Sequence, residues 1–236
     1  MQIDERMDIT MPVIEKTREE TFAMETTIVR TPSKAYLMAK RLFDIIASSA
    51  ALILLSPVFL ILAFLVKRDD GGPVTYVCNR VGKKGKTIRI RKFRSMVLDA
   101  DNLEKYLTQD QIEQYKREFK LDDDPRMTKI GKILRKTSLD ELPQLLSILN
   151  GDMSIVGPRP IINEELAFYG NHVDEFLSVT PGLTGYWQVH GRNNATYESG
   201  QRQKLELYYV RNCSLWLDLT IIIQTVWVVL KGDGAK

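Results

Sequence analysis

The sequence predicts a mostly helical α+β protein that forms one membrane-associated, monotopic domain. One long uncharged segment contains a central proline, a short basic turn joins two segments of alternating apolar residues, and most other apolar residues recur at helical spacing. The 236 residues indicate one domain or at most two. A formal net charge of +3 gives no strong overall field, so we expect no nucleic-acid partner.

The uncharged segment Ile45–Val66 reaches about 33 Å as a helix, which is sufficient to cross a hydrocarbon core. At its centre, Ser56 precedes Pro57, which has no N–H to offer the carbonyl of Ile53, so the helix should kink there. Basic residues flank both ends: Lys40 and Arg41 precede the segment, and Lys67 and Arg68 follow it. The positive-inside rule places both flanks on the cytoplasmic side. A re-entrant helix satisfies both, and an ordinary transmembrane helix with a tolerated proline is the alternative.

Shorter elements are expected after this segment. A small β-hairpin should form where Val74–Asn79 and Lys86–Arg94 flank the turn VGKKGK. Leu98–Lys120 should be helical, with Thr108 and Gln111 as a capping box that divides it. Further helices are expected over Ile130–Lys136, Glu141–Leu149, Glu164–Tyr169 and Tyr197–Cys213. Leu215–Leu230, which carries Trp216 and Trp227, fits an interfacial amphipathic helix, and a buried core helix fits it about equally.

Three regions follow from these elements. Residues 1–35 are expected to form a mobile tail with one short helix near Val13–Met24. Residues 36–70 form the re-entrant membrane helix, and residues 71–236 form a cytosolic domain that ends in the interfacial helix.

The hairpin carries basic residues and no acidic residue in its turn and second strand. These residues are Lys83, Lys84, Lys86, Arg89, Arg91, Lys92 and Arg94. Near a bilayer such a patch attracts anionic lipid or phosphate by about 1 kcal/mol per basic residue, and the alternative is an ordinary solvated face. The chain has no P-loop and no glycine-rich dinucleotide motif, so a nucleotide would need arginines and a metal ion.

Adjacent carboxylates precede a proline in Ser138-Leu-Asp-Glu-Leu-Pro143. Because proline is tolerated only in the first helical turn, the helix should begin near Asp140. One interpretation makes Asp140 an N-cap and Glu141 a partner of the helix dipole. The other makes one carboxylate a nucleophile and associates the other with a metal, where backbone N–H groups attract phosphate. Mg²⁺ prefers such a pair together with phosphate oxygens.

Two arginines are further candidates for phosphate binding. Arg159 lies between two prolines, and Arg192 follows Gly191. Two cysteines and two histidines have no spacing typical of zinc ligands, so we expect no zinc site.

Taken in order, the motifs resemble those of one family. They are KRLFD (residues 40–44), the apolar segment with Ser56-Pro57, KFRSM (92–96), DPRMTKIGKILRKTSLDELPQL (124–145), GDMSIVGPRP (151–160), PGLTGYWQVHGR (181–192) and YYVRNCSLWLD (208–218). This set resembles the bacterial sugar transferases, which are monotopic polyprenol-phosphate phosphoglycosyl transferases, over about residues 36–232. The chain lacks the N-terminal helix bundle of the larger members and so resembles the minimal catalytic form.

The resemblance implies an enzyme that moves a sugar 1-phosphate from a UDP-sugar to undecaprenyl phosphate and releases UMP. It implies that Asp140 is the nucleophile, which forms a covalent aspartyl-phosphosugar, and that Glu141 belongs to the same dyad and supports Mg²⁺. It implies that Lys92, Arg135, Arg159 and Arg192 contact phosphates, while Asp218 matches a family acid of less defined role. It also favours the re-entrant helix at Ser56 and Pro57.

The implied location is the bacterial inner membrane, with the catalytic domain on its cytoplasmic face. The implied pathway is the first membrane step of exopolysaccharide, capsule or glycoconjugate synthesis, upstream of glycosyltransferases that extend the product. The transferred sugar and the oligomeric state stay open, and a homodimer is one alternative. Two rival functions are a membrane-anchored binding protein without activity and a membrane-associated phosphohydrolase.

Overall fold

The computed structural model describes residues 32–119, 121, 123–191 and 195–231. The predicted tail helix near Val13–Met24 lies outside these residues. The described part is mostly helical, with one antiparallel two-stranded sheet and one short parallel pair of strands, which agrees with the expected α+β class.

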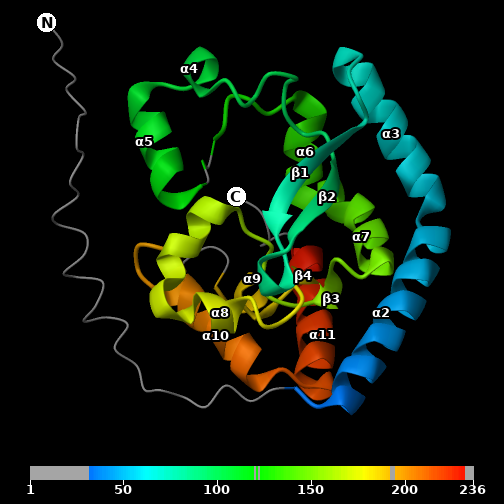
Figure 1. Cartoon of the computed structure of the whole chain (residues 1–236). Helices are drawn as coiled ribbons and strands as arrows, with labels where there is room; N and C mark the ends of the chain where they lie inside the picture. The colour runs from blue at the N-terminus through cyan, green and yellow to red at the C-terminus, as the bar shows by residue number, and fades with distance from the viewer. Residues whose placement is uncertain (1–31, 120, 122, 192–194, 232–236) are drawn as a thin grey trace, which may run out of the picture.

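Two consecutive helices, α2 (Lys34–Leu54) and α3 (Ser56–Asp70), form an arc along one side of the molecule (Figure 1). They are bent by 63° at Leu55, next to the predicted Ser56-Pro57 break. The hydroxyl of Ser56 donates a hydrogen bond to the carbonyl oxygen of Ile53, which Pro57 cannot reach with an N–H. Within the described residues, neither helix alone has the length and apolar content to cross a bilayer, whereas the bent pair together has both.

The predicted hairpin is confirmed as β1 (Thr75–Val81) and β2 (Thr87–Phe93), which pair antiparallel with Cys78 opposite Ile90. A 3₁₀ turn, η1 (Lys83–Gly85), connects them. Ile88 and Ile90 on β2 are buried in a core that also contains Leu145 and Ile148 of α7 (Leu145–Asn150), and part of α2 covers this core. The end of β2 is covered by α3, because Phe93 packs with Leu62 and Val66.

The segment between Leu98 and Lys120 contains two helices, α4 (Leu103–Tyr106) and α5 (Gln109–Glu118), divided at the predicted position. The predicted capping box is present, since Thr108 and Gln111 each accept a hydrogen bond from the other's backbone N–H. Helix α6 (Lys129–Thr137) follows close to its predicted bounds.

The helix predicted to begin near Asp140 starts differently. Ser138 ends α6 in the left-handed region with φ of 57°, and the 3₁₀ helix η2 (Leu139–Gln144) then runs into α7. Asp140 is therefore inside η2 and is not an N-cap, so that interpretation is wrong. Pro143 fits there because the α-helix α7 begins only after it, at Leu145.

The last part of the chain packs below the hairpin in Figure 1. It contains β3 (Ser154–Val156), the 3₁₀ helix η3 (Asn163–His172), α8 (Val173–Phe176), β4 (Gly182–Thr184), α9 (Tyr186–His190), α10 (Gln201–Asn212) and α11 (Leu215–Lys231). The predicted helix Glu164–Tyr169 is thus a 3₁₀ helix, and the one expected from Tyr197 begins at Gln201 because Gly200 has φ of 68°.

The parallel pair β3 and β4 was not predicted. Its strands have three residues each, which is too short for a readable alternation. Backbone segments approach so closely here that a Cβ on Gly182 would lie 2.0 Å from the nitrogen of Gly157. This contact fixes the start of the segment that carries Arg159.

Candidate active site

Five basic and acidic candidates from four separate segments meet beside β2. Lys92 Nζ on β2 lies 2.6 Å from Glu141 Oε1 on η2, and Arg159 Nη1 lies 3.7 Å from the same oxygen. Arg135, near the end of α6, and the two other cations all act electrostatically on Asp140. The structure therefore brings Lys92, Arg135, Asp140, Glu141 and Arg159 together.

Asp140 is the most enclosed of these candidates, with 6% of its surface exposed. Burial raises the pKa of its carboxyl above the usual value; the charge of Lys92 opposes this, and that of Glu141 adds to it. A desolvated carboxylate is more basic, and so more nucleophilic, than an aspartate in water. The cations around Asp140 still attract anionic substrates to the site.

Arg159 extends from the segment after β3 and keeps 35% of its side chain exposed. Burial lowers the pKa of Arg159, but the negative charges of Glu141, Glu165 and Glu206 outweigh this effect, so the pKa is raised overall. The guanidinium is therefore charged and partly open, as a phosphate ligand must be.

Arg135 also contacts two side chains just after β2. Its Nε donates to Ser95 Oγ at 3.1 Å, and its Nη2 lies 3.5 Å from Met96 Sδ. Both partners belong to the KFRSM motif, so this motif holds Arg135 as well as supplying Lys92.

One predicted residue, Asp218, is not part of this group, and another cannot be placed in it or outside it. Arg192 lies outside the described residues. Asp218 is buried on α11 and accepts hydrogen bonds from Tyr209 at 2.7 Å, Lys40 at 2.8 Å and Tyr36 at 3.0 Å. Its partners join α2, α10 and α11, so in this structure Asp218 holds helices together.

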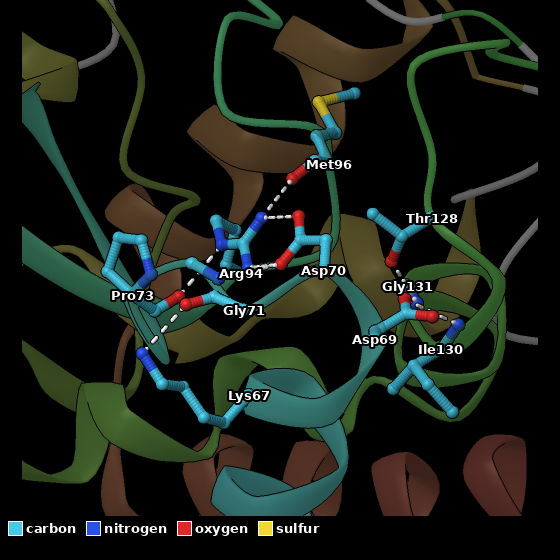
Figure 2. A network of polar contacts seen from close by, with 11 residues as sticks. Lys67, Asp69, Asp70, Gly71, Pro73, Arg94, Met96, Thr128, Ile130 and Gly131 are labelled. Atoms are coloured by element: carbon cyan, nitrogen blue, oxygen red, sulfur yellow. Dashed lines mark hydrogen bonds and ion pairs between the residues drawn. The ribbon is translucent and has the colours of Figure 1, made fainter.

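An ionic contact that sequence reasoning missed fixes the end of α3 to β2 and α6 (Figure 2). Asp70 and Arg94 form a bidentate ion pair, and Arg94 Nε also donates to the carbonyl oxygen of Pro73 at 2.8 Å. Asp69 accepts the backbone N–H of Ile130 at the start of α6. Arg94 was read as one cation of a basic patch, and only the fold reveals its partner.

The carboxylates fit Mg²⁺ only together with a substrate. The described residues contain no group of three or more His, Cys, Asp or Glu side chains that could hold a metal. Asp140 and Glu141 give two carboxylates, and Glu141 Oε1 is already engaged by Lys92. Mg²⁺ commonly takes one or two carboxylates and completes its shell with phosphate oxygens and water, which this pair allows.

Comparison with known proteins identifies relatives over most of the chain. Residues 35–232 match the family described as "Bacterial sugar transferase". An "Undecaprenyl-phosphate galactose phosphotransferase" of Salmonella typhimurium is 48% identical over 199 residues, which are 83% of this chain and 41% of that protein. A "UDP-glucose:undecaprenyl-phosphate glucose-1-phosphate transferase" of Klebsiella pneumoniae is 40% identical over 198 residues, 81% of this chain and 40% of that protein.

A shorter relative is matched over most of its length. The "Exopolysaccharide production protein ExoY" of Rhizobium meliloti is 45% identical over 201 residues, which are 84% of this chain and 88% of that protein. The chain thus spans about two fifths of the length of the first two relatives and nearly all of the third.

Proposed function

The chain belongs to the bacterial sugar transferase family, and from this premise we propose that it transfers a sugar 1-phosphate from a UDP-sugar to undecaprenyl phosphate. Relatives are named as undecaprenyl-phosphate sugar phosphotransferases and as an exopolysaccharide production protein. The observation that carries the proposal is a buried aspartate beside a second carboxylate, with three cations from three separate elements around it.

In the proposed reaction, a carboxylate oxygen of Asp140 attacks the phosphorus that bears the sugar. The bond from that phosphorus to the bridging oxygen breaks, and UMP leaves with the bond electrons. A phosphate oxygen of undecaprenyl phosphate then attacks the aspartyl-phosphosugar and restores the carboxylate. Because every oxygen involved is anionic, charge neutralisation by Lys92, Arg135 and Arg159 is the main demand on the site.

We assign Mg²⁺ to Asp140 and Glu141 as the cofactor of this reaction. When bound, it would neutralise phosphate charge and align the diphosphate for in-line attack. Lys92 Nζ donates a hydrogen bond to Glu141 Oε1 at 2.6 Å, so the direction of the Glu141 carboxylate is set before a substrate arrives.

We also propose that α2 and α3 enter the cytoplasmic leaflet of the inner membrane and leave on the same side. Two features support this. Lys40 and Arg41 bind the domain at the start of α2, and Asp70 binds the same domain at the end of α3, so both ends of the arc share one side. Large apolar side chains on α2, α3 and α11 are exposed, including Leu54 at 77% and Trp216 at 77%.

A UMP-release assay over a panel of UDP-sugars, with and without undecaprenyl phosphate, tests the proposed function. We expect sustained UMP release only when the lipid is present, together with a stoichiometric burst in its absence. Sustained release without the lipid would indicate a phosphohydrolase. No release with any UDP-sugar would favour a binding protein, and either result would overturn the proposal.

A further inference from the structure

The backbone of Arg159 depends on a buried acid that the proposed reaction does not use. Arg159 lies between Pro158 and Pro160, which have no N–H, so its own N–H is the one main-chain donor of this tripeptide. Both carboxylate oxygens of Glu206 on α10 accept this N–H, each at 3.3 Å. Glu206 is completely buried.

Arg202, the cation that acts most strongly on Glu206, is engaged by other side chains. Arg202, one turn earlier on α10, lies between the rings of Trp187 and Tyr197, at 4.2 and 4.0 Å, and its Nη2 is 3.4 Å from Glu165 on η3. Burial raises the pKa of Glu206 to about 7; Arg202 and Arg159 oppose this, and Glu165 adds to it. The remaining titratable group that faces Glu206 is Tyr169 of η3.

A buried acid of this kind is costly, and an apolar residue of similar size would pack in its place without that cost. What an apolar residue would not provide is an acceptor for the Arg159 N–H. Since leaving a buried N–H without an acceptor is costly, the segment from Pro158 to Pro160 would shift toward another acceptor.

We propose that Glu206 is a positioning residue, which fixes the backbone of Arg159 so that its guanidinium reaches the phosphates of the nucleotide sugar. The inference rests on the proposed function. The guanidinium approaches Glu141 only to 3.7 Å and is partly exposed, so it is not locked by that contact. A fixed backbone with a free side-chain end lets Arg159 contact a phosphate without first reordering the loop.

The test compares two substitutions of similar volume. Glu206→Gln keeps an oxygen that accepts the Arg159 N–H, whereas Glu206→Leu removes the acceptor. We expect Glu206→Leu to lower kcat/KM for the UDP-sugar at least tenfold, mainly through KM, and Glu206→Gln to stay within about threefold of wild type.

A double-mutant cycle with Arg159→Ala distinguishes positioning from general support of the fold. If Glu206 acts through Arg159, Glu206→Leu should cost almost nothing further once Arg159 is alanine. Asp44→Asn is the control, because Asp44 is also a buried acid that accepts a main-chain N–H, but that of Ile155, away from Arg159 and Glu206. Its effect should be small and should add to that of Arg159→Ala.

Several results would overturn the inference. Losses from Glu206→Leu and Arg159→Ala that add fully would do so, as would wild-type kinetics in Glu206→Leu. If Glu206→Leu does not fold, the kinetics of Glu206→Gln decide: the acceptor is kept there, so a rise in KM of more than tenfold in the folded Glu206→Gln protein contradicts the inference. A wild-type protein that releases no UMP would instead refute the proposed function, so the two failures are distinguishable.

Discussion

The ion pair between Asp70 and Arg94 gives a prediction whose size follows from the structure. Asp70 lies beyond the uncharged segment, at the end of α3, and Arg94 lies just after β2 (Figure 2). Replacing Asp70 by Asn removes the charge but keeps a side-chain oxygen that accepts the N–H of Gly72, as Asp70 does at 3.0 Å. The change therefore isolates the ionic part of the contact.

The hydrogen bonds from Arg94 lower the pKa of Asp70 from 3.8 to about 2. At about 1.36 kcal/mol per pKa unit, this shift corresponds to about 2.4 kcal/mol of unfolding free energy. The side chain of Asp70 is 28% exposed, and solvent screening reduces the expected value to about 1–2 kcal/mol. Because the folded pKa is lowered, this stability is present above pH of about 4 and is lost as the pH falls toward 2.

Urea unfolding in a non-ionic detergent, followed by tryptophan fluorescence, measures the difference. Asp70→Asn should unfold more easily than wild type at pH 7, and the difference should narrow as the pH is lowered from 4 toward 2. Asp123→Asn is the control, since its carboxylate is 91% exposed and lies 3.3 Å from Lys132, so its effect should be close to zero. Equal effects of both substitutions, or a difference that does not narrow at low pH, would refute the reasoning.

Three further predictions concern the proposed site and its membrane. Asp140→Asn should lose turnover by several orders of magnitude, and substantial turnover would contradict the role of Asp140 as the nucleophile. Its Tm should be unchanged or higher, because burial disfavours the charged carboxylate and raises the pKa of Asp140, whereas the amide is neutral. Activity should vanish with EDTA and return with Mg²⁺ or Mn²⁺, and full turnover in excess chelator would rule out the metal. In intact cells, cysteines placed at Lys34 and Thr75 should both resist an impermeant maleimide until lysis, whereas labelling at Lys34 from outside would indicate a spanning helix.

Local patterns predicted the elements of the fold that local chemistry controls. The break at Ser56-Pro57 follows from a missing N–H, and the capping box at Thr108 follows from two side chains three residues apart. The start of η2 could not be read in this way. It depends on Ser138 in a left-handed conformation, which this residue type rarely adopts and which no glycine marks in the sequence.

For the site, sequence motifs identified the clustered charged residues better than the residues that support them. Lys92, Arg135, Asp140, Glu141 and Arg159 are all brought together. Arg159 was readable from the two prolines beside it and the two carboxylates from the proline that follows them, whereas Lys92 and Arg135 came from the resemblance to a family. Glu206 was missed although a signal existed, since it shares a helical face with the apolar Val210 of α10, where a solvated acid is not expected. Its partner is 47 residues away, and no local pattern indicates that distance.

The residues that bind the polar side chains of α2 are synthesised long after α2 itself. Asp218 follows Lys40 by 178 residues, and Ile155, whose N–H binds Asp44, follows Asp44 by 111 residues. At about 5–20 residues per second, Asp218 is added to the nascent chain about 9–36 s after Lys40. Throughout this interval α2 carries charged side chains without their native partners, and lipid disfavours them strongly. On the membrane topology proposed above, we therefore expect the nascent helix to wait at the membrane surface until the domain that binds it has been made.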